Sequence, residues 1–112
     1  MTDTALIDTG VFAELQAATG ADFVVELVDT FAEELPGMLG ELRAALEVAS
    51  ADRFRRAAHS LKTNALSFGA QALGEQAKAL EVGGLPADVA VLDTLHTLAD
   101  QSLATLQALT RG

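Results

Sequence analysis

The sequence contains no cysteine, no tryptophan and no tyrosine, and it has only two prolines. Without cysteine the chain has no disulfide and no thiolate nucleophile, and cysteine-ligated zinc and iron–sulfur sites are excluded. It also lacks a run of about 18 apolar residues, and its N-terminus has no basic region before an apolar one. The sequence therefore has neither a predicted membrane span nor a predicted signal peptide. We expect a cytoplasmic protein with no membrane partner.

Basic residues are also scarce, with 7 Lys and Arg against 16 Asp and Glu, which gives a formal net charge of −9. A chain of this charge repels nucleic acid phosphates, so nucleic acid is not expected as a partner. The charge is uneven, because residues 53–74 contain no acid and four bases, Arg53, Arg55, Arg56 and Lys62. This basic segment is either a solvated surface or a small site for an anionic group or an acidic partner.

The length and composition favour a single helical domain. The 112 residues allow one domain, and half of them are apolar, so the chain can bury a core of its own. Aromatic residues make up only 4%, while alanine, leucine, glutamate and glutamine dominate, which favours helix over strand. We expect an all-α domain over residues 1–112, with its core in about residues 8–109, acting as a free-standing monomer.

Apolar periodicity and helix-ending residues predict an antiparallel four-helix bundle with an additional short N-terminal helix. The expected helices are, in chain order, residues 8 or 9 to 18, 21–49, 51 or 52 to 69, 70–82, and 86 to the C-terminus. Pro36 lies inside the second of these, so we expect a kink or a short break there. Pro86 suits the first turn of the last helix.

The third predicted helix has a histidine opposite its apolar face. At 100° per residue, the apolar positions fall within about 50° of one direction, and His59 lies about 160° from it. The imidazole is therefore expected in solvent. Arg55, Lys62 and Leu66 share its side of the helix, and Lys62 is three residues on, so its ammonium can reach an anion attached to His59.

The next helix is expected to bring further charged residues to His59. Gly69 closes the turn between the two helices, and residues equally distant from the turn of an antiparallel hairpin lie side by side. His59 is ten residues before Gly69, while Lys78 and Glu81 are nine and twelve residues after it. Both side chains can flank the imidazole if the fourth helix turns that edge toward the third. The alternative is that they are ordinary solvated residues.

The segment AHSLKTNALSFGAQALGEQAKALE, residues 58–81, resembles the signature AHxLKxxxxxxGxxxL of histidine-containing phosphotransfer (HPt) domains. The preceding FAEELPGMLGELRAAL is similar to the helix that comes before it in that family. The signature positions matched are His59, Leu61, Lys62, Gly69 and Leu73. The resemblance covers about residues 8–109. Thr63 stands where the family often has glycine, which puts an unusually close approach of a partner at that point in doubt.

The resemblance implies a carrier of phosphoryl groups, phosphorylated on His59, in a bacterial-type phosphorelay. Its partners would be a response-regulator receiver domain and a histidine kinase or hybrid kinase. Glu81 would accept a hydrogen bond from Nδ1 of His59, and Gly69 would leave room for the receiver. The chain would need no cofactor of its own, because the receiver would supply Mg²⁺.

Docking is expected through apolar residues surrounded by charge. Leu66 lies on the exposed side of the third helix, and Phe12 of the first helix extends this surface or, alternatively, packs into the core. Arg55 and Arg56 would mainly speed the encounter with an acidic receiver. Thr63 and Gly69 are also expected to be docking residues.

Two other functions are compatible with these residues. One is an HPt-like docking module that binds a receiver without carrying phosphate. The other is a metal site at Asp93 and His96, although the chain has only one such carboxylate–histidine pair, and a structural histidine is favoured. No glycine-rich phosphate loop is present, so no ATP-dependent kinase activity is expected.

Overall fold

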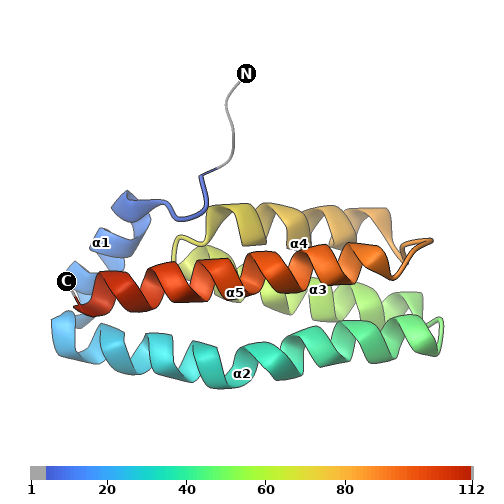
Figure 1. The fold of residues 1–112 in the computed structure, drawn as a ribbon, viewed down its shortest axis with the longest axis horizontal. Coiled ribbons are helices and arrows are strands. Elements are labelled where there is room, and N and C mark those ends of the chain that lie inside the picture. Colours follow the sequence, from blue (N-terminus) through green and yellow to red (C-terminus); the bar gives the residue numbers. More distant parts are fainter. Residues whose placement is uncertain (1–4, 112) are drawn as a thin grey trace.

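The computed structural model describes residues 5–111, and these residues form helices joined by turns and short connections. The helices are α1 (Thr9–Thr19), α2 (Ala21–Glu47), α3 (Ala51–Ser67), α4 (Gln71–Gly83) and α5 (Ala90–Arg111). Figure 1 shows α2 to α5 running alongside one another, with the shorter α1 at one end. The predicted all-α fold, a four-helix bundle with an additional short N-terminal helix, is confirmed.

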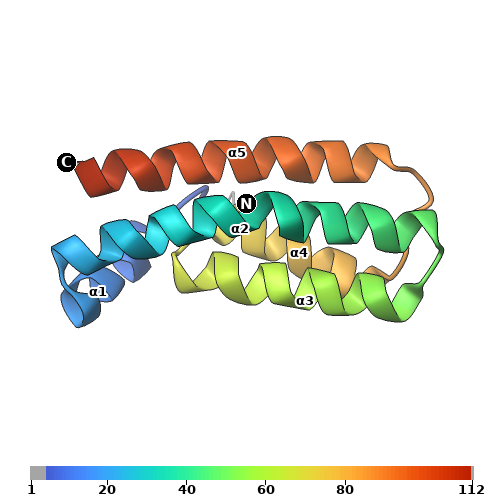
Figure 2. The same ribbon diagram turned by 90° about the horizontal axis from the view of Figure 1, so that it is seen from below.

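The four long helices pack as a closed ring around one core. Helix α3 packs against α4 and α2, and α5 packs against α2 and α4. Figure 2 shows α5 and α3 on opposite sides of the bundle. Helix α1 packs against α2 and α3. The rings of Phe31 on α2 and Phe68 just after α3 stack with their centroids 4.8 Å apart. None of the helices within residues 5–111 has an apolar stretch of the length needed to cross a membrane.

The apolar stripe of α2, which the helical periodicity predicts, is buried or partly buried along its length. Its members Val24, Val28, Phe31, Leu35, Leu42 and Ala45 are buried, and Met38 is partly buried. The helix continues through Pro36 without the break that the sequence allowed, and Figure 1 shows it bowed along its length. Because Pro36 is exposed and the stripe packs on both sides of it, the missing backbone donor does not end the helix.

The predicted start of the last helix is wrong. Pro86 lies in the connection after α4, and α5 begins at Ala90. Asp88 Oδ1 accepts a hydrogen bond from the Ala90 N–H at 2.9 Å, which satisfies one of the free donors at this helix start. The side chain of Asp88, and not the ring of Pro86, therefore marks the beginning of α5.

The chain before α1 is joined to the turn between α3 and α4. The Asp8 N–H donates to the Gly69 carbonyl at 2.6 Å, and the Ala72 N–H donates to the Ala5 carbonyl at 3.1 Å. Ile7 between them is buried. The Asp8 carboxylate also accepts hydrogen bonds from Gly10 and Val11 at the start of α1. This connection fixes α1 against the end of the bundle.

Candidate functional site

Helix α3 presents His59 to solvent. Ser50 Oγ accepts a hydrogen bond from the Arg53 N–H at 3.3 Å and begins the helix. The residues that face the core are Phe54, Ala57, Ala58, Leu61 and Ala65, all of them buried. His59 is on the opposite side, and 58% of its side chain is exposed. The solvent exposure predicted from the helical periodicity is confirmed.

Helix α4 brings a carboxylate to the imidazole. Glu81 Oε2 lies 2.7 Å from Nδ1 of His59. Only 19% of the Glu81 side chain is exposed, because α4 turns it toward α3. No hydrogen bond to Nε2 of His59 occurs within residues 5–111. An ionised carboxylate can only accept hydrogen bonds, so in the neutral ring Nδ1 has the proton and Nε2 has the free lone pair.

Lys62 binds the other oxygen of the same carboxylate. Its Nζ lies 2.7 Å from Glu81 Oε1, and 23% of the lysine side chain is exposed. The hydrogen bond from Lys62, followed by the one from His59, lowers the pKa of Glu81 below its usual value. Glu81 therefore remains ionised at neutral pH, with one partner on each oxygen. His59, Lys62 and Glu81 form a connected cluster, which we call the His59 cluster.

Lys78, the other charged residue predicted beside His59, is not part of this cluster. It is exposed on α4 and makes no ion pair within residues 5–111. The buried residues of α4 include Leu73, Ala77 and Leu80, and Glu81 lies closer to this face than Lys78 does. The rotation of α4 thus brings the carboxylate to His59 and leaves the ammonium in solvent.

Two predicted docking residues follow His59 along α3. Thr63 is exposed, and its hydroxyl donates to the His59 carbonyl at 3.0 Å, so its polar atom is used within the helix. Leu66 is 37% exposed and packs on Gly74 of α4, where an added Cβ would clash with Leu66 Cδ2. Gly74 was not singled out in the sequence, although a glycine inside a predicted helix is a sign of close packing.

The arginines before His59 are already paired. Arg55 and Arg56 lie 2.7 and 2.8 Å from the two oxygens of Asp52, in the first turn of α3. Both arginine side chains are more than half exposed. The hydrogen bond from Arg55 and the charge of Arg56 lower the pKa of Asp52. Asp52 therefore offsets part of the positive charge that the sequence places ahead of His59.

The structure contradicts the docking roles predicted for Phe12 and Gly69. Phe12 is 2% exposed and belongs to the core, which is the alternative left open for it. Gly69 has φ +79° and is buried under the chain before α1. A Cβ at Gly69 would lie 2.6 Å from the Asp8 carbonyl oxygen. Both residues serve the packing of α1, so neither offers a surface to a receiver.

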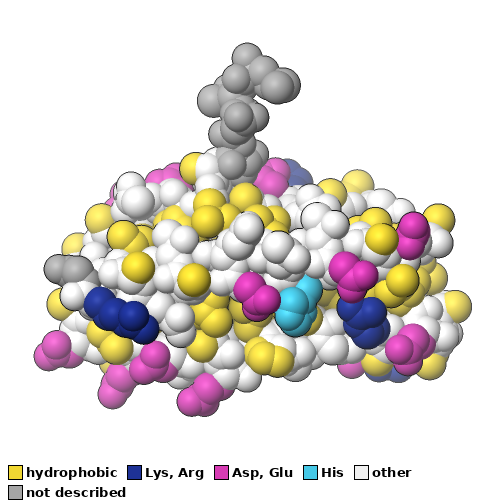
Figure 3. Space-filling view, viewed as in Figure 1, with side chains coloured by type: hydrophobic (Ala, Val, Ile, Leu, Met, Phe, Trp, Pro, Cys, Tyr) yellow, Lys and Arg dark blue, Asp and Glu magenta, His cyan; other side chains and the backbone are white. Residues whose placement is uncertain are grey.

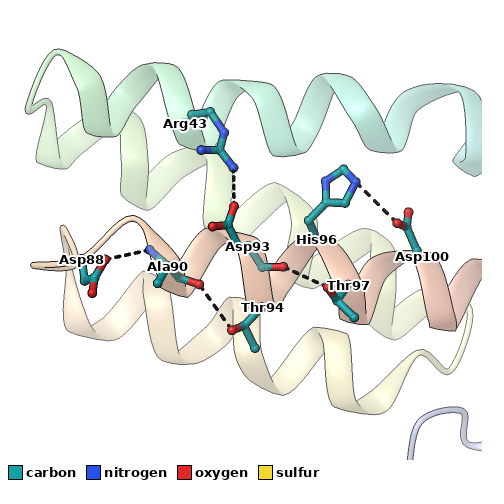
Figure 4. A network of polar contacts seen from close by, with 8 residues as sticks. All are labelled: Arg43, Asp88, Ala90, Asp93, Thr94, His96, Thr97 and Asp100. Atoms are coloured by element: carbon teal, nitrogen blue, oxygen red, sulfur yellow. Dashed lines mark hydrogen bonds and ion pairs between the residues drawn. The ribbon is translucent and has the colours of Figure 1, made fainter.

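The second histidine lies on the opposite side of the bundle, on α5. Figure 3 views this side and shows a histidine between acidic side chains. Figure 4 shows that His96 points to Asp100, and that Asp93 points to Arg43 of α2. The His96 Nε2 to Asp100 Oδ2 distance is 3.5 Å, and the Arg43 to Asp93 distance is 3.2 Å. Asp93 is thus paired with Arg43 and not with His96. Residues 5–111 contain no group of three His, Asp or Glu side chains able to hold a metal.

Comparison with known proteins identifies the family. The model of the Hpt domain matches residues 26–108, which is most of the chain. Among solved structures, histidine-containing phosphotransfer protein B from Pseudomonas aeruginosa PAO1 is 28% identical, with a TM-score of 0.74. The match covers 95% of this chain and 91% of that protein. No curated protein sequence gives a significant match.

The chain belongs to the Hpt domain family, as its signature residues suggested. Membership gives it a phosphotransfer role in two-component signalling. Hpt domains are phosphocarrier modules and not kinases.

Proposed function

We propose that this protein is a phosphorelay intermediate in which His59 accepts a phosphoryl group and passes it to a response-regulator receiver. The donor is an aspartyl phosphate of a receiver domain or the phosphohistidine of a histidine kinase. The observation that carries the proposal is the His59 cluster, in which an exposed imidazole is bound at Nδ1 by Glu81, 2.7 Å away. Such a ring offers Nε2 as the nucleophile.

The transfer from a receiver is a balanced displacement at phosphorus. Nε2 of His59 forms a bond to phosphorus while the bond from phosphorus to the aspartate oxygen breaks, and the carboxylate leaves with the electron pair. The ring becomes positively charged, and its Nδ1 proton stays shared with Glu81. The Lys62 ammonium, on the other oxygen of Glu81, is the cation available to the phosphoryl oxygens.

The remaining catalytic groups belong to the partner. A receiver with bound Mg²⁺ would neutralise the phosphoryl charge during transfer, so this chain needs no cofactor of its own. We also propose that the protein does not phosphorylate itself from ATP. Incubation with ATP and Mg²⁺ alone is therefore expected to leave it unlabelled.

The test is phosphoryl transfer from a labelled receiver domain. We expect label on the wild-type protein that is lost in acid and retained in alkali, as a phosphoramidate bond requires. His59→Gln is expected to take up no label, and His96→Gln is the matched control, since both histidines are more than half exposed. If the wild type binds the receiver but is never labelled, the protein is a docking module and the proposed transfer is wrong.

A further inference from the structure

The Lys62–Glu81 pair is the least exposed ion pair within residues 5–111. Its side chains are 23% and 19% exposed, whereas in every other pair at least one partner is more than 40% exposed. A partly covered pair is less weakened by water and salt than one in open solvent. Lys62 is therefore bound to Glu81 more firmly than a lysine in a fully exposed pair would be to its partner.

The pair also holds Lys62 on one particular side of the imidazole. Glu81 contacts the ring at Nδ1 and binds Lys62 through its second oxygen, so the ammonium lies toward the Nδ1 side. A phosphoryl group on His59 would be attached at Nε2, the ring nitrogen that Glu81 does not contact. Lys62 has three N–H donors and a flexible four-carbon side chain, so it can turn from one anion to the other.

The two anions that compete for Lys62 have different charges. The Glu81 carboxylate has a single negative charge, which it also shares with the Nδ1 proton of His59. A phosphoryl group near neutral pH has a charge of about −1.5 to −2 and three acceptor oxygens. The phosphoryl group is therefore the stronger partner once it is present, while Glu81 is the partner of Lys62 before transfer.

We propose that Glu81 is a positioning residue for Lys62 as well as for His59. It holds the ammonium beside the ring before transfer, and the phosphoryl group on Nε2 then takes Lys62 from it. This inference rests on the proposed function and deepens it. It assigns to one carboxylate the alignment of both the nucleophile and the cation.

A double-mutant cycle tests whether Glu81 acts through Lys62. The probe is phosphoramidate, a small phosphoryl donor, so that no receiver is needed. Nε2 of His59 forms the bond to phosphorus while the phosphorus–nitrogen bond of the donor breaks and ammonia leaves. The proteins compared are wild type, Glu81→Gln, Lys62→Met and the double variant. Glutamine keeps an oxygen acceptor for Nδ1 but lacks the charge that holds Lys62.

We expect each single variant to slow phosphoryl uptake by about threefold or more, and the double variant to be no slower than the slower single variant. If the fold reductions in uptake rate of the two single variants multiply in the double variant, Glu81 acts on the ring alone. That result would overturn the proposal. Asp100→Asn is the matched control, because it removes the carboxylate beside the other exposed histidine. It is expected to leave the uptake rate unchanged.

NMR of the two lysine side-chain amines follows the movement of Lys62 directly. Lys62 and Lys78 are the only lysines, so Lys78, exposed on the same helix as Glu81, serves as an internal reference. Phosphorylation of His59 is expected to shift the Lys62 amine signal and to leave that of Lys78 in place. An unchanged Lys62 signal in protein phosphorylated on His59 would overturn the exchange. If phosphoramidate labels His59 and a receiver does not, the relay function fails and the positioning role is still measured.

Discussion

The two histidines of this protein are almost equally exposed, yet their surroundings differ in every respect that matters for phosphoryl transfer. The His59 side chain is 58% exposed and the His96 side chain 56%. Glu81 binds His59 at Nδ1, 2.7 Å away, whereas Asp100 lies 3.5 Å from Nε2 of His96. That longer distance exceeds the usual range of an N–H···O hydrogen bond.

The cations near the two histidines differ as well. Lys62 binds the carboxylate that contacts His59, while Arg43, a cation near His96, is paired with Asp93. Exposure alone therefore does not distinguish the two histidines as candidate phosphoryl acceptors. What distinguishes His59 is the contact of Glu81 at Nδ1, the absence of a hydrogen bond to Nε2 within residues 5–111, and the Lys62 ammonium on the same carboxylate.

The largest expected effect comes from exchanging the two histidines for glutamine in turn. His59→Gln should abolish phosphoryl acceptance, and His96→Gln should retain it. Both variants should unfold within about 0.5 kcal/mol of wild type, because each side chain is largely in solvent. Denaturant unfolding followed by circular dichroism measures this. A large loss of stability in His59→Gln would mean that the residue supports the fold.

A smaller effect is expected when a charge is placed on an apolar surface. Leu66→Asp should weaken receiver binding by about tenfold, mainly through faster dissociation, if the receiver docks over α3. Val25→Asp is its control, because both side chains are 37% exposed. Val25 lies about five helical turns before Arg43, on the same side of α2 as the His96 surroundings. Surface plasmon resonance with a cognate receiver compares them, and equal affinities for wild type and Leu66→Asp would place docking elsewhere.

Acid should open the His59 cluster through Glu81. Its pKa in the folded protein is lowered, first by Lys62 and then by His59, relative to an unfolded-state value of about 4.3. The stability contributed by ionised Glu81 is therefore fully present above the unfolded-state pKa and is lost as the pH falls through the folded-state pKa. Unfolding free energies of wild type and Glu81→Gln should differ at neutral pH and converge in acid. A difference that persists unchanged below both pKa values would contradict this.

The smallest effect is expected from the arginines at the start of α3. Raising the salt concentration should slow receiver association, but replacing Arg55 or Arg56 by glutamine should change the rate only slightly. Asp52 is paired with both guanidinium groups and offsets part of their charge. Stopped-flow association rates at low salt measure the difference. A tenfold loss from either substitution would mean that the pair with Asp52 opens on docking.

Local patterns in the sequence were sufficient to predict the helices and the outward direction of His59. Helical periodicity depends on neighbouring residues only, so it gave the buried stripe of α2 and the exposed side of α3. Counting from the turn at Gly69 brought both Lys78 and Glu81 near the position opposite His59, with Lys78 the nearer in the count. The rotation of α4, which depends on its packing against α3, determines which of the two side chains contacts His59. The number of residues from Gly69 does not give this rotation.

The errors at Phe12 and Gly69 concern contacts between segments far apart in the sequence. Phe12 was compatible with a surface or a core position, and the packing of α1 against α2 and α3 buries it. Gly69 has the turn role expected of a glycine, but the hydrogen bond from Asp8 covers it. No local pattern predicts that residues 5–8 cross this turn, so the loss of Gly69 as a docking residue was visible only in the structure.

The most direct test of the central claim is to determine which ring nitrogen is phosphorylated. Protein with ¹⁵N-labelled histidine rings, phosphorylated by a receiver, gives separate NMR signals for the two nitrogens of His59 and of His96. The account predicts a phosphorus–nitrogen coupling at Nε2 of His59, a retained proton on its Nδ1, and an unchanged His96 ring. Coupling at Nδ1 of His59, or at either nitrogen of His96, would contradict it.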